Sequence, residues 1–360
     1  MADPLVFNQQ VRIFWNTEPT GALATLRDPL RGTALEVDDV AVLDLCERTS
    51  SPRTRAELVA ELADTGTPAD EREQLIASLV EHRVLVSPDD NRWTKWDQYN
   101  WGEAAVFHYL SRNQVFLDEA SRELSSPVRT ATLRRYLDES GPPELFTRRD
   151  VVYRPLPPPT EVAHVDFYEV LMDRRTIRKY NGKPTDAGVL SSVLHEATAR
   201  ARALRLEIER GYRSDPELLL KSWGSAFEVY VVAHRVEGVA QGIYHYDMRD
   251  HGLGLVRAGD FEDQVYNGIW GQPMALKTCF TIFLVACFER YMWRYRYDRG
   301  LRNLLTNMGE LAQIFILAGI ARGLGNSMTP ASRDSFLDDL LGLEPAGEQT
   351  MYFLGFGHYR

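Results

Sequence analysis

The sequence has little cysteine and no excess of positive charge, and both shortages exclude classes of function. Its three cysteines, Cys46, Cys279 and Cys287, form neither a Cys-x-x-Cys pair nor a zinc-like spacing, so no metal site is expected. The formal net charge of −10 argues against nucleic-acid binding, because phosphate backbones need a basic surface. Such sparse cysteine fits a reducing cytoplasm.

The chain also lacks long hydrophobic runs and several familiar catalytic motifs. The longest uncharged run that suits a core, residues 278–288, is too short to span a membrane and is typical of a buried strand. The N-terminal residues show no signal-peptide pattern, and no Gly-x-Ser-x-Gly, His-Glu-x-x-His or P-loop motif occurs. What remains is a chain of 360 residues, 44% hydrophobic and 26% charged, which is long enough for two domains.

Residues 1–90 are predicted to form a small domain of helices followed by a short strand. Thr54 and Glu57 fit a capping box at the start of a helix, and residues 70–82 place Leu75 and Leu79 on one helical face. Residues 83–86 favour a strand, so the order suggests a winged helix-turn-helix. The usual ligand of that shape is DNA, which the acidic composition disfavours. A peptide that adds to the wing strand is the alternative.

Residues 91–165 are predicted to form an aromatic-rich helical connector, with helix from Glu103 onward. Its Trp and Tyr content is too apolar for a floppy linker, and prolines at 155–159 mark a stiff boundary. Residues 166–360 are predicted to form an α+β domain. Helices are expected at 186–199 and 301–321, and strands at 226–236, 243–246, 253–256, 278–288 and 351–357.

The segment from Asp166 to Tyr180 is a candidate phosphate-binding element. Asp166 begins a short helix with a variant of the capping box. After that helix, Arg174, Thr176 and Arg178 alternate, so an extended chain would point all three to one side. Guanidinium and hydroxyl donors suit phosphate oxygens. Taken alone, however, the run is better explained as a solvated basic face beside a helix end.

Several segments, in this order, resemble the flavin-dependent nitroreductase-like family, and more closely its SagB-type branch of azoline dehydrogenases. Residues 174–180 (Arg-Arg-Thr-Ile-Arg-Lys-Tyr) are similar to the family's opening Arg-Arg-Ser-x-Arg-x-Phe motif. Residues 293–300 (Trp-Arg-Tyr-Arg-Tyr-Asp-Arg-Gly) resemble its Trp-Lys-Tyr-Gly-x-Arg-Gly segment. Residues 307–313 fall where the family has a Gly-His-x-x-Gln helix, and Gly-Leu-Gly at 323–325 falls before its flavin-contacting strand. Residues 101–108 are similar to the connector of members that bind a leader peptide.

This resemblance implies a nitroreductase-like FMN domain, with a mixed sheet flanked by helices, behind a winged-helix-like domain that binds a leader peptide. It implies FMN as the cofactor, with its phosphate held by Arg174, Thr176 and Arg178. The implied cofactor-binding residues are Arg174, Arg175, Thr176, Arg178, Ser222, Gly224, Gln313, Gly323 and Gly325. A homodimer follows from the family's habit of building flavin sites at a dimer interface, and a cyclodehydratase is the expected partner.

Two departures from the family pattern affect the site. The family's Ser-Gly-Gly-x-Tyr-Pro-x-Glu loop appears as Lys-Ser-Trp-Gly-Ser-Ala-Phe-Glu at 221–228, without the Tyr-Pro pair. The catalytic Lys-Tyr pair appears as Arg294-Tyr295, and an arginine stays protonated and cannot act as a general base. Tyr295 is therefore the expected base, with Arg294 lowering its pKa by favouring the phenolate. The alternative is that both are ordinary loop residues near a domain surface.

The predicted function is FMN-dependent oxidation of thiazolines or oxazolines to azoles in a ribosomally made, leader-bearing peptide. Two alternatives stay open. One is an FMN-dependent reductase of dehydroamino acids or another small substrate, which the Arg294 substitution favours. The other is a non-catalytic, peptide-binding scaffold subunit. No nucleic-acid or membrane partner is expected.

Overall fold

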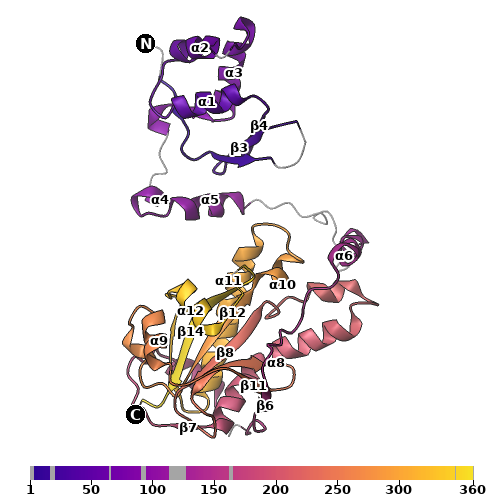
Figure 1. Cartoon of the computed structure of the whole chain (residues 1–360), viewed down its shortest axis with the longest axis vertical. Helices are drawn as coiled ribbons and strands as arrows, with labels where there is room; N and C mark the ends of the chain where they lie inside the picture. The colour runs from indigo at the N-terminus through magenta and orange to yellow at the C-terminus, as the bar shows by residue number, and fades with distance from the viewer. Residues whose placement is uncertain are drawn as a thin grey trace. The chain divides into compact units, whose positions relative to one another are not determined.

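The computed structural model describes residues 4–16, 21–64, 66–90, 95–112, 127–161, 165–344 and 346–359. The chain divides into two compact units, residues 1–115 and 116–360 (Figure 1). Parts of the predicted connector, residues 91–94, 113–126 and 162–164, lie outside the described ranges. Within those ranges, no helix combines the length and the apolar character needed to cross a membrane.

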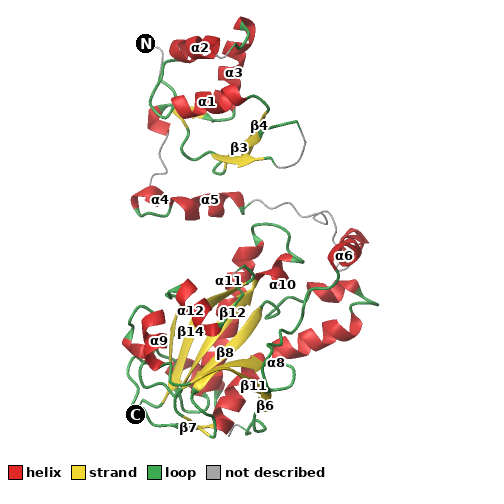
Figure 2. Cartoon of the chain, viewed as in Figure 1, coloured by secondary structure: helices red, strands yellow, loops and turns green. Residues whose placement is uncertain are grey.

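The N-terminal unit combines two small sheets with helices (Figure 2). Strands β2 (Arg12–Trp15), β3 (Ala24–Asp28) and β4 (Thr33–Val37) form an antiparallel sheet, and β1 (Val6–Phe7) pairs with β5 (Leu85–Val86). The helices are α1 (Val40–Arg48), α2 (Arg55–Asp64), α3 (Ala69–Glu81), α4 (Lys95–Gln98) and α5 (Gly102–Leu110), with a 3-10 turn η1 (Pro88–Asp90). The expected strand after the helices is the short β5, whereas the three-stranded sheet precedes them and was not predicted.

Local sequence signals explain where these helices begin. The Thr54 amide donates to Glu57 Oε2 at 2.7 Å, and the Glu57 amide donates to Thr54 Oγ1 at 3.3 Å, so the predicted capping box is present at α2. Asp39 caps α1 by accepting from the Ala41 amide. The apolar faces of α1, α2 and α3 then close over one core that contains Leu58 and Leu79.

A seven-stranded antiparallel sheet forms the centre of the C-terminal unit. Its strand order is β13 (Gly325–Thr329), β14 (Glu348–Gly357), β12 (Phe280–Cys287), β8 (Phe227–Ala233), β10 (Gly242–Asp247), β11 (Gly252–Ala258) and β6 (Tyr153–Pro155). Beside it, β7 (Thr185–Asp186) pairs in parallel with β9 (Val236–Glu237). The expected α+β class is confirmed, but the sheet was expected to be mixed and the pairs of these seven strands are all antiparallel. Pro155, the first proline of the cluster, ends β6, which tolerates proline because it lies at the edge of the sheet.

Helices cover both faces of this sheet, so its central strands are buried on both sides. Helices α8 (Ala187–Gly211) and α11 (Gly300–Ile320) pack on one face, and α9 (Glu262–Gly268), η3 (Pro273–Ala275) and α12 (Asp334–Leu341) pack on the other. In β8, Val229 and Val231 join the first core, while Tyr230 and Val232 join the second. Strand β12 is also buried on both faces, which explains its continuous apolar run. The remaining helices are α6 (Pro127–Ser140), α7 (Phe167–Asp173), η2 (Pro216–Leu220) and α10 (Phe288–Met292).

The segment after α7 is extended and is fastened to the sheet at two points. Thr176 forms a parallel bridge with Asn326, and the Ile177 amide donates to the Asn326 carbonyl at 2.7 Å. Further along, the buried Tyr180 hydroxyl lies 2.9 Å from Ser327 Oγ and 3.1 Å from the Gly355 carbonyl. These contacts fix the arginine-rich run against β13 and β14.

Removing the Tyr180 hydroxyl should therefore weaken the C-terminal unit. In Tyr180→Phe, the buried Gly355 carbonyl loses this donor, and we expect a loss of about 1–2 kcal/mol in the free energy of unfolding. Chemical denaturation measures this change. Tyr99→Phe, which alters a hydroxyl on an exposed side chain of the N-terminal unit, is the control and should stay near wild type. Equal stability of the two variants would contradict the anchoring role of Tyr180.

Candidate functional site

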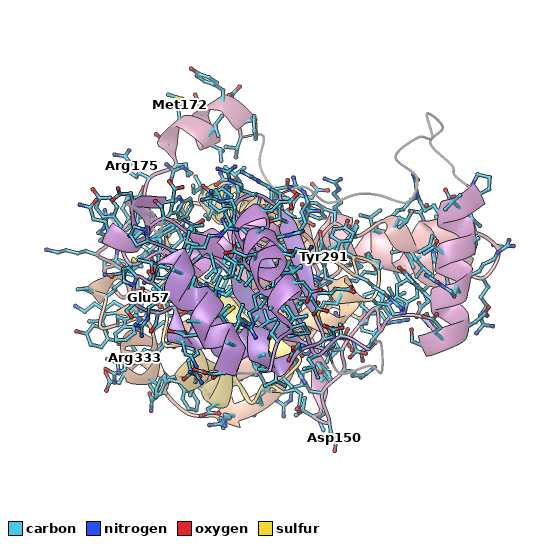
Figure 3. All side chains as sticks on the ribbon, turned by 90° about the horizontal axis from the view of Figure 1, so that it is seen from above. Glu57, Asp150, Met172, Arg175, Tyr291 and Arg333 are labelled. Atoms are coloured by element: carbon cyan, nitrogen blue, oxygen red, sulfur yellow. The ribbon has the colours of Figure 1, made fainter. Side chains whose placement is uncertain are left out.

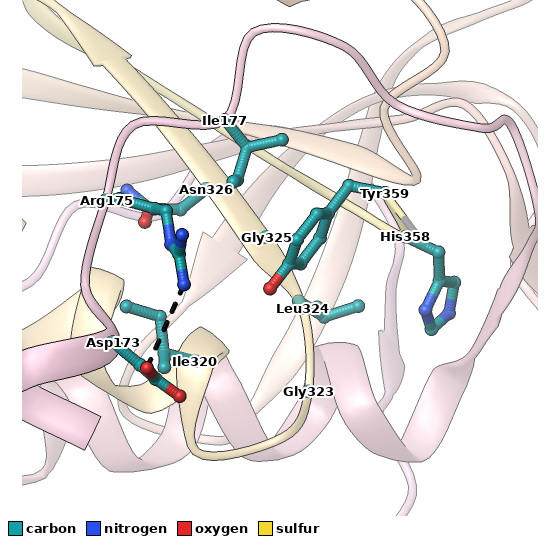
Figure 4. A pocket seen from close by; sticks show the side chains of 10 residues that line it. All are labelled: Asp173, Arg175, Ile177, Ile320, Gly323, Leu324, Gly325, Asn326, His358 and Tyr359. Atoms are coloured by element: carbon teal, nitrogen blue, oxygen red, sulfur yellow. Dashed lines mark ion pairs between the residues drawn. The ribbon is translucent and has the colours of Figure 1, made fainter. Parts of the chain in front are cut away.

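A pocket of about 280 Å³ opens between the arginine-rich segment and the turn that joins α11 to β13 (Figure 4). Three chain segments meet there. Its lining residues are Asp173, Arg175, Ile177, Ile320, Gly323, Leu324, Gly325, Asn326, His358 and Tyr359. We call it the Arg175 pocket. It brings together three residues that the sequence singled out, namely Arg175, Gly323 and Gly325.

Two glycines shape the turn of the Arg175 pocket. Gly323 has φ +73°, a left-handed conformation, and its amide donates to the Ile320 carbonyl at 2.9 Å as α11 ends. At Gly325, a Cβ would lie 2.5 Å from the Tyr359 ring and 2.9 Å from Ile177. Close packing thus restricts position 325 to glycine, and backbone geometry favours glycine at position 323.

Asn326 supplies the pocket with an unsatisfied amide. Its side chain is only 1% exposed, and both Oδ1 and Nδ2 lack a hydrogen-bond partner in the described part of the chain. Buried polar atoms are normally paired, so an unpaired amide that lines a pocket is suited to a ligand. Arg175 is also available, because its contact with Asp173 is loose at 3.9 Å. The sequence offered one signal for Asn326: a polar residue directly after Gly-Leu-Gly, inside a buried strand.

The structure places the other residues of the predicted phosphate grip outside the Arg175 pocket. Arg174, Thr176 and Arg178 are not among its lining residues, whereas Arg175 and Ile177 are. The side chains therefore alternate as predicted. The face that lines the pocket carries Arg175 and Ile177, and not Arg174, Thr176 and Arg178. Within the described ranges, neither Arg174 nor Arg178 forms an ion pair, so both remain open to an anion. Figure 3 shows Met172 on α7 and, three residues further along the chain, Arg175 close to the end of that helix.

A second group joins the turn at residues 222–225 to the segment after α10, and we call it the Tyr295 group. The Tyr295 hydroxyl lies 2.8 Å from Ser222 Oγ. Arg294 Nη1 donates to Ser225 Oγ at 3.0 Å, and Ser225 Oγ donates to the Ser222 carbonyl at 2.7 Å. Gly224 adopts φ +65° in this turn. Thus the structure brings together Ser222, Gly224, Arg294 and Tyr295, four residues that the sequence had assigned.

Further tyrosines belong to the Tyr295 group. The rings of Tyr291 and Tyr295 are 4.7 Å apart, and those of Tyr295 and Tyr297 are 6.0 Å apart. Burial raises the pKa of Tyr291, and the neighbouring Tyr295 raises it further. The sequence carried a signal for Tyr291, because it stands four residues before Tyr295 at helical spacing.

Arg294 is a buried cation with donors to spare. It is 5% exposed, and burial lowers its pKa to about 10, although the neighbouring Tyr295 and Tyr291 oppose that shift. It therefore stays protonated at neutral pH. Its Nε and Nη2 have no hydrogen-bond partner in the described part of the chain. Burying a charged group costs free energy unless acceptors form hydrogen bonds with its donors. The site is therefore suited to a ligand oxygen or nitrogen.

The Arg175 pocket and the Tyr295 group lie at opposite ends of α11. Gly300, the first residue of that helix, packs against Tyr295, and Gly323 follows its end. Its 21 residues span about 30 Å at 1.5 Å per residue. Gln313 lies along α11 and belongs to neither group. No cluster of three or more potential metal ligands occurs among the described residues.

Comparisons with known proteins agree on the family of the C-terminal unit. The model of the nitroreductase family matches residues 171–358, just over half of the chain. The trifolitoxin operon protein TfxC of Rhizobium leguminosarum bv. trifolii is 27% identical over 352 residues, which cover 93% of this chain and 96% of that protein. The trifolitoxin-processing protein TfxB of the same organism is 27% identical over 124 residues, or 34% of this chain and 33% of TfxB.

A solved structure shows the same fold. It comes from Anabaena variabilis, is described as a candidate nitroreductase, and is 19% identical with a TM-score of 0.54. The match covers 72% of this chain and 48% of that one. At this level of identity, the likeness concerns the fold alone.

The Ser222–Tyr295 contact can be tested by stability, without any substrate. Ser222→Ala and Tyr295→Phe should each lower the free energy of unfolding by about 1 kcal/mol, because each removes one partner of a partly buried hydrogen bond. The double variant should lose clearly less than the sum of the two, which is the mark of interacting residues. Strict additivity in denaturant titrations would contradict the contact.

Proposed function

Because the chain belongs to the nitroreductase family, we propose that it is an FMN-dependent dehydrogenase that oxidises azoline rings in a ribosomally made, leader-bearing peptide. Membership of the family makes the chain an oxidoreductase. The relatives named for the trifolitoxin operon and for trifolitoxin processing support a role in peptide modification. The observation that carries the proposal is the Tyr295 hydroxyl, paired with Ser222 beside the buried cation of Arg294.

The donors around the arginine-rich segment fit FMN. Its phosphate requires several strong donors, and Arg174, Arg175 and Arg178 lie within one short extended stretch. Arg174 and Arg178 lie outside the Arg175 pocket, and we place the phosphate on their side of the stretch. Arg175 and the unpaired amide of Asn326 line the pocket and offer hydrogen bonds to another polar part of the cofactor. FMN bound there would supply the acceptor for a hydride.

We further propose that the site is completed in a homodimer. The Arg175 pocket and the Tyr295 group are separated by about 30 Å along α11, which exceeds the length of one FMN molecule. A flavin held at the arginine-rich segment therefore needs the Tyr295 group of a second copy. Helices α7 and α11, which pack against each other, expose apolar side chains that can contact such a copy: Phe167, Tyr168, Leu171 and Met172 on α7, and Leu301 and Leu305 on α11.

Azoline oxidation removes one proton and one hydride from the ring, and the chain must provide the acceptor of the proton. We assign that role to Tyr295, because Arg294 stays cationic. When the phenol of Tyr295 is ionised, Ser222 Oγ at 2.8 Å donates a hydrogen bond to it and the Arg294 cation offsets its charge.

The N-terminal unit offers a surface for the leader of the peptide. A groove of about 660 Å³ lies beside β2 and α1, with the acidic side chains of Asp44 and Glu47 at its rim. Ile13, Trp15 and Val40 are exposed along it, and Trp15 is 68% exposed. In the described part of the sheet, β2 is an edge strand, which can pair with an extended peptide. A cyclodehydratase that forms the azolines is the proposed partner.

One observation favours a second candidate, a reductase of dehydroamino acids in a modified peptide. The unpaired Nε and Nη2 of Arg294 can hold a carbonyl oxygen as negative charge develops on it, a role that suits reduction of a double bond next to a carbonyl. In that reaction the product gains two hydrogens.

Binding of FMN tests the cofactor assignment. The purified protein should be yellow, and Arg174→Ala and Arg178→Ala should each weaken FMN binding at least tenfold, since a charge-assisted hydrogen bond contributes about 1.5–3 kcal/mol. Quenching of FMN fluorescence by the apoprotein measures this affinity. Arg148→Ala, which removes an exposed cation paired loosely with Asp250, should bind as wild type does. Wild-type affinity in both grip variants would remove the phosphate site.

Mass spectrometry of a treated azoline peptide tests the reaction. We expect a loss of two hydrogens per ring, and Tyr295→Phe should lower kcat at least 100-fold, because a general base contributes about 10²–10⁴-fold. Tyr266→Phe on α9 serves as the control and should keep wild-type kcat. Full activity of Tyr295→Phe would refute the base, and a gain of two hydrogens would favour the reductase.

A further inference from the structure

One buried carboxylate connects the two segments that form the Tyr295 group. We propose that Glu228 and Arg290 are positioning residues that hold Tyr295 against Ser222. This inference rests on the proposed function only for the role of Tyr295 in the reaction. The geometry that it describes can be tested without a substrate.

Glu228 is surrounded by cations at the start of β8. It is 1% exposed, Arg205 Nη1 donates to its Oε1 at 3.0 Å, and Arg290 Nη1 donates to the same oxygen. His245 Nε2 lies 3.1 Å from its Oε2. Burial alone would raise the pKa of Glu228, but Arg290 and Arg205 hold it well below the usual range. The carboxylate is therefore charged at any working pH and keeps both guanidinium groups in place.

The first arm runs through Arg205 to the turn that carries Ser222. Arg205 lies on α8 and is fully buried, and its Nη2 donates to the Gly224 carbonyl at 2.8 Å and to the Phe227 carbonyl at 2.5 Å. Gly224 lies between Ser222 and Ser225, the two hydroxyl residues that contact Tyr295 and Arg294. The charge of Glu228 thus fixes this turn through Arg205.

The second arm runs through Arg290 to Tyr295. Arg290 is part of α10, and helical hydrogen bonds continue past the end of that helix to Tyr295. The Trp293 amide donates to the Glu289 carbonyl at 2.8 Å, and the Tyr295 amide donates to the Tyr291 carbonyl at 3.1 Å. On its other side, Arg290 Nη2 donates to Thr147 Oγ1 and, at 3.0 Å, to Glu144 Oε2. The position of Arg290 therefore sets the position of Tyr295 relative to β8.

Among the described residues, the hydrogen bonds of Glu228 and Arg290 do not include the Tyr295 hydroxyl, so their effect is exerted through the backbone. A lysine at position 290 keeps the charge but cannot reproduce the planar fork that joins Glu228 to Thr147 and Glu144. It must give up some of these contacts, and α10 is then free to shift against the turn at residues 222–225. We therefore expect Tyr295 to shift from its position beside Ser222.

Arg290→Lys tests this, with Arg235→Lys as the matched control. Arg235 also forms a two-pronged pair, with Glu262, but at the opposite end of β8. We expect Arg290→Lys to lower kcat for ring oxidation at least tenfold while KM stays within twofold. Hydrogen–deuterium exchange should become faster in residues 222–228 and 288–296. Arg235→Lys should lower the melting temperature without either effect.

A second variant keeps the test decisive if Arg290→Lys does not fold. Glu144→Gln combined with Thr147→Val alters a solvent-facing pair, since the Glu144 side chain is 62% exposed, and removes only the outer support of Arg290. It should show the same exchange pattern and a smaller fall in kcat. Unchanged exchange in both segments overturns the positioning role, as does an equal loss of kcat in Arg235→Lys. Faster exchange with unchanged kcat supports the positioning role and instead removes Tyr295 from the reaction.

Discussion

The buried charge of Glu228 links four elements of the C-terminal unit. A carboxylate without solvent must be compensated, and here two guanidinium groups and an imidazole do so. These partners come from α8, α10 and β10, so one charge fixes three elements relative to β8. Well-packed apolar residues could give similar stability but would not specify which backbone carbonyls are held. The benefit of the ionic arrangement lies in the geometry of the Tyr295 group.

Helix α11 imposes the second constraint, because it separates the two groups of candidate residues. Its apolar face is fixed by the sheet, and its length then sets the distance between the Tyr295 group and the Arg175 pocket. In the proposed function, a single chain thus carries the donors for a phosphate and the phenol for a proton at positions that one cofactor cannot bridge. Pairing two copies through α7 and α11 would place complementary halves together. This makes self-association part of the proposed catalysis.

The sequence predicted those features that depend on local periodicity. The buried strand β12, the helix α11 and the capping box of α2 follow from apolar spacing and one side-chain pattern. The strands β2 to β4 were missed, because they are short and because β2 and β4 are partly exposed. Helix α8 extends to Gly211, well beyond the prediction, since its charged second half still buries Ala201 and Ile208. In the arginine-rich run, the alternating residues predicted that side chains point to two opposite sides. They did not show which side lines the pocket. The contact of Ser222 with Tyr295 joins residues 73 apart, and Glu228 gave no sign in the sequence of its three partners.

The arginine at position 294 determines how the proposed chemistry must be divided. Burial lowers its pKa only to about 10, so it remains a cation and cannot take a proton from a substrate at neutral pH. Its contact with Ser225 uses one nitrogen and leaves two others unpaired in the described part of the chain. A lysine there would offer a single point charge, whereas the guanidinium can hold the turn and a ligand at once. In the proposed reaction, proton transfer therefore falls to Tyr295, and Arg294 supplies orientation and positive charge.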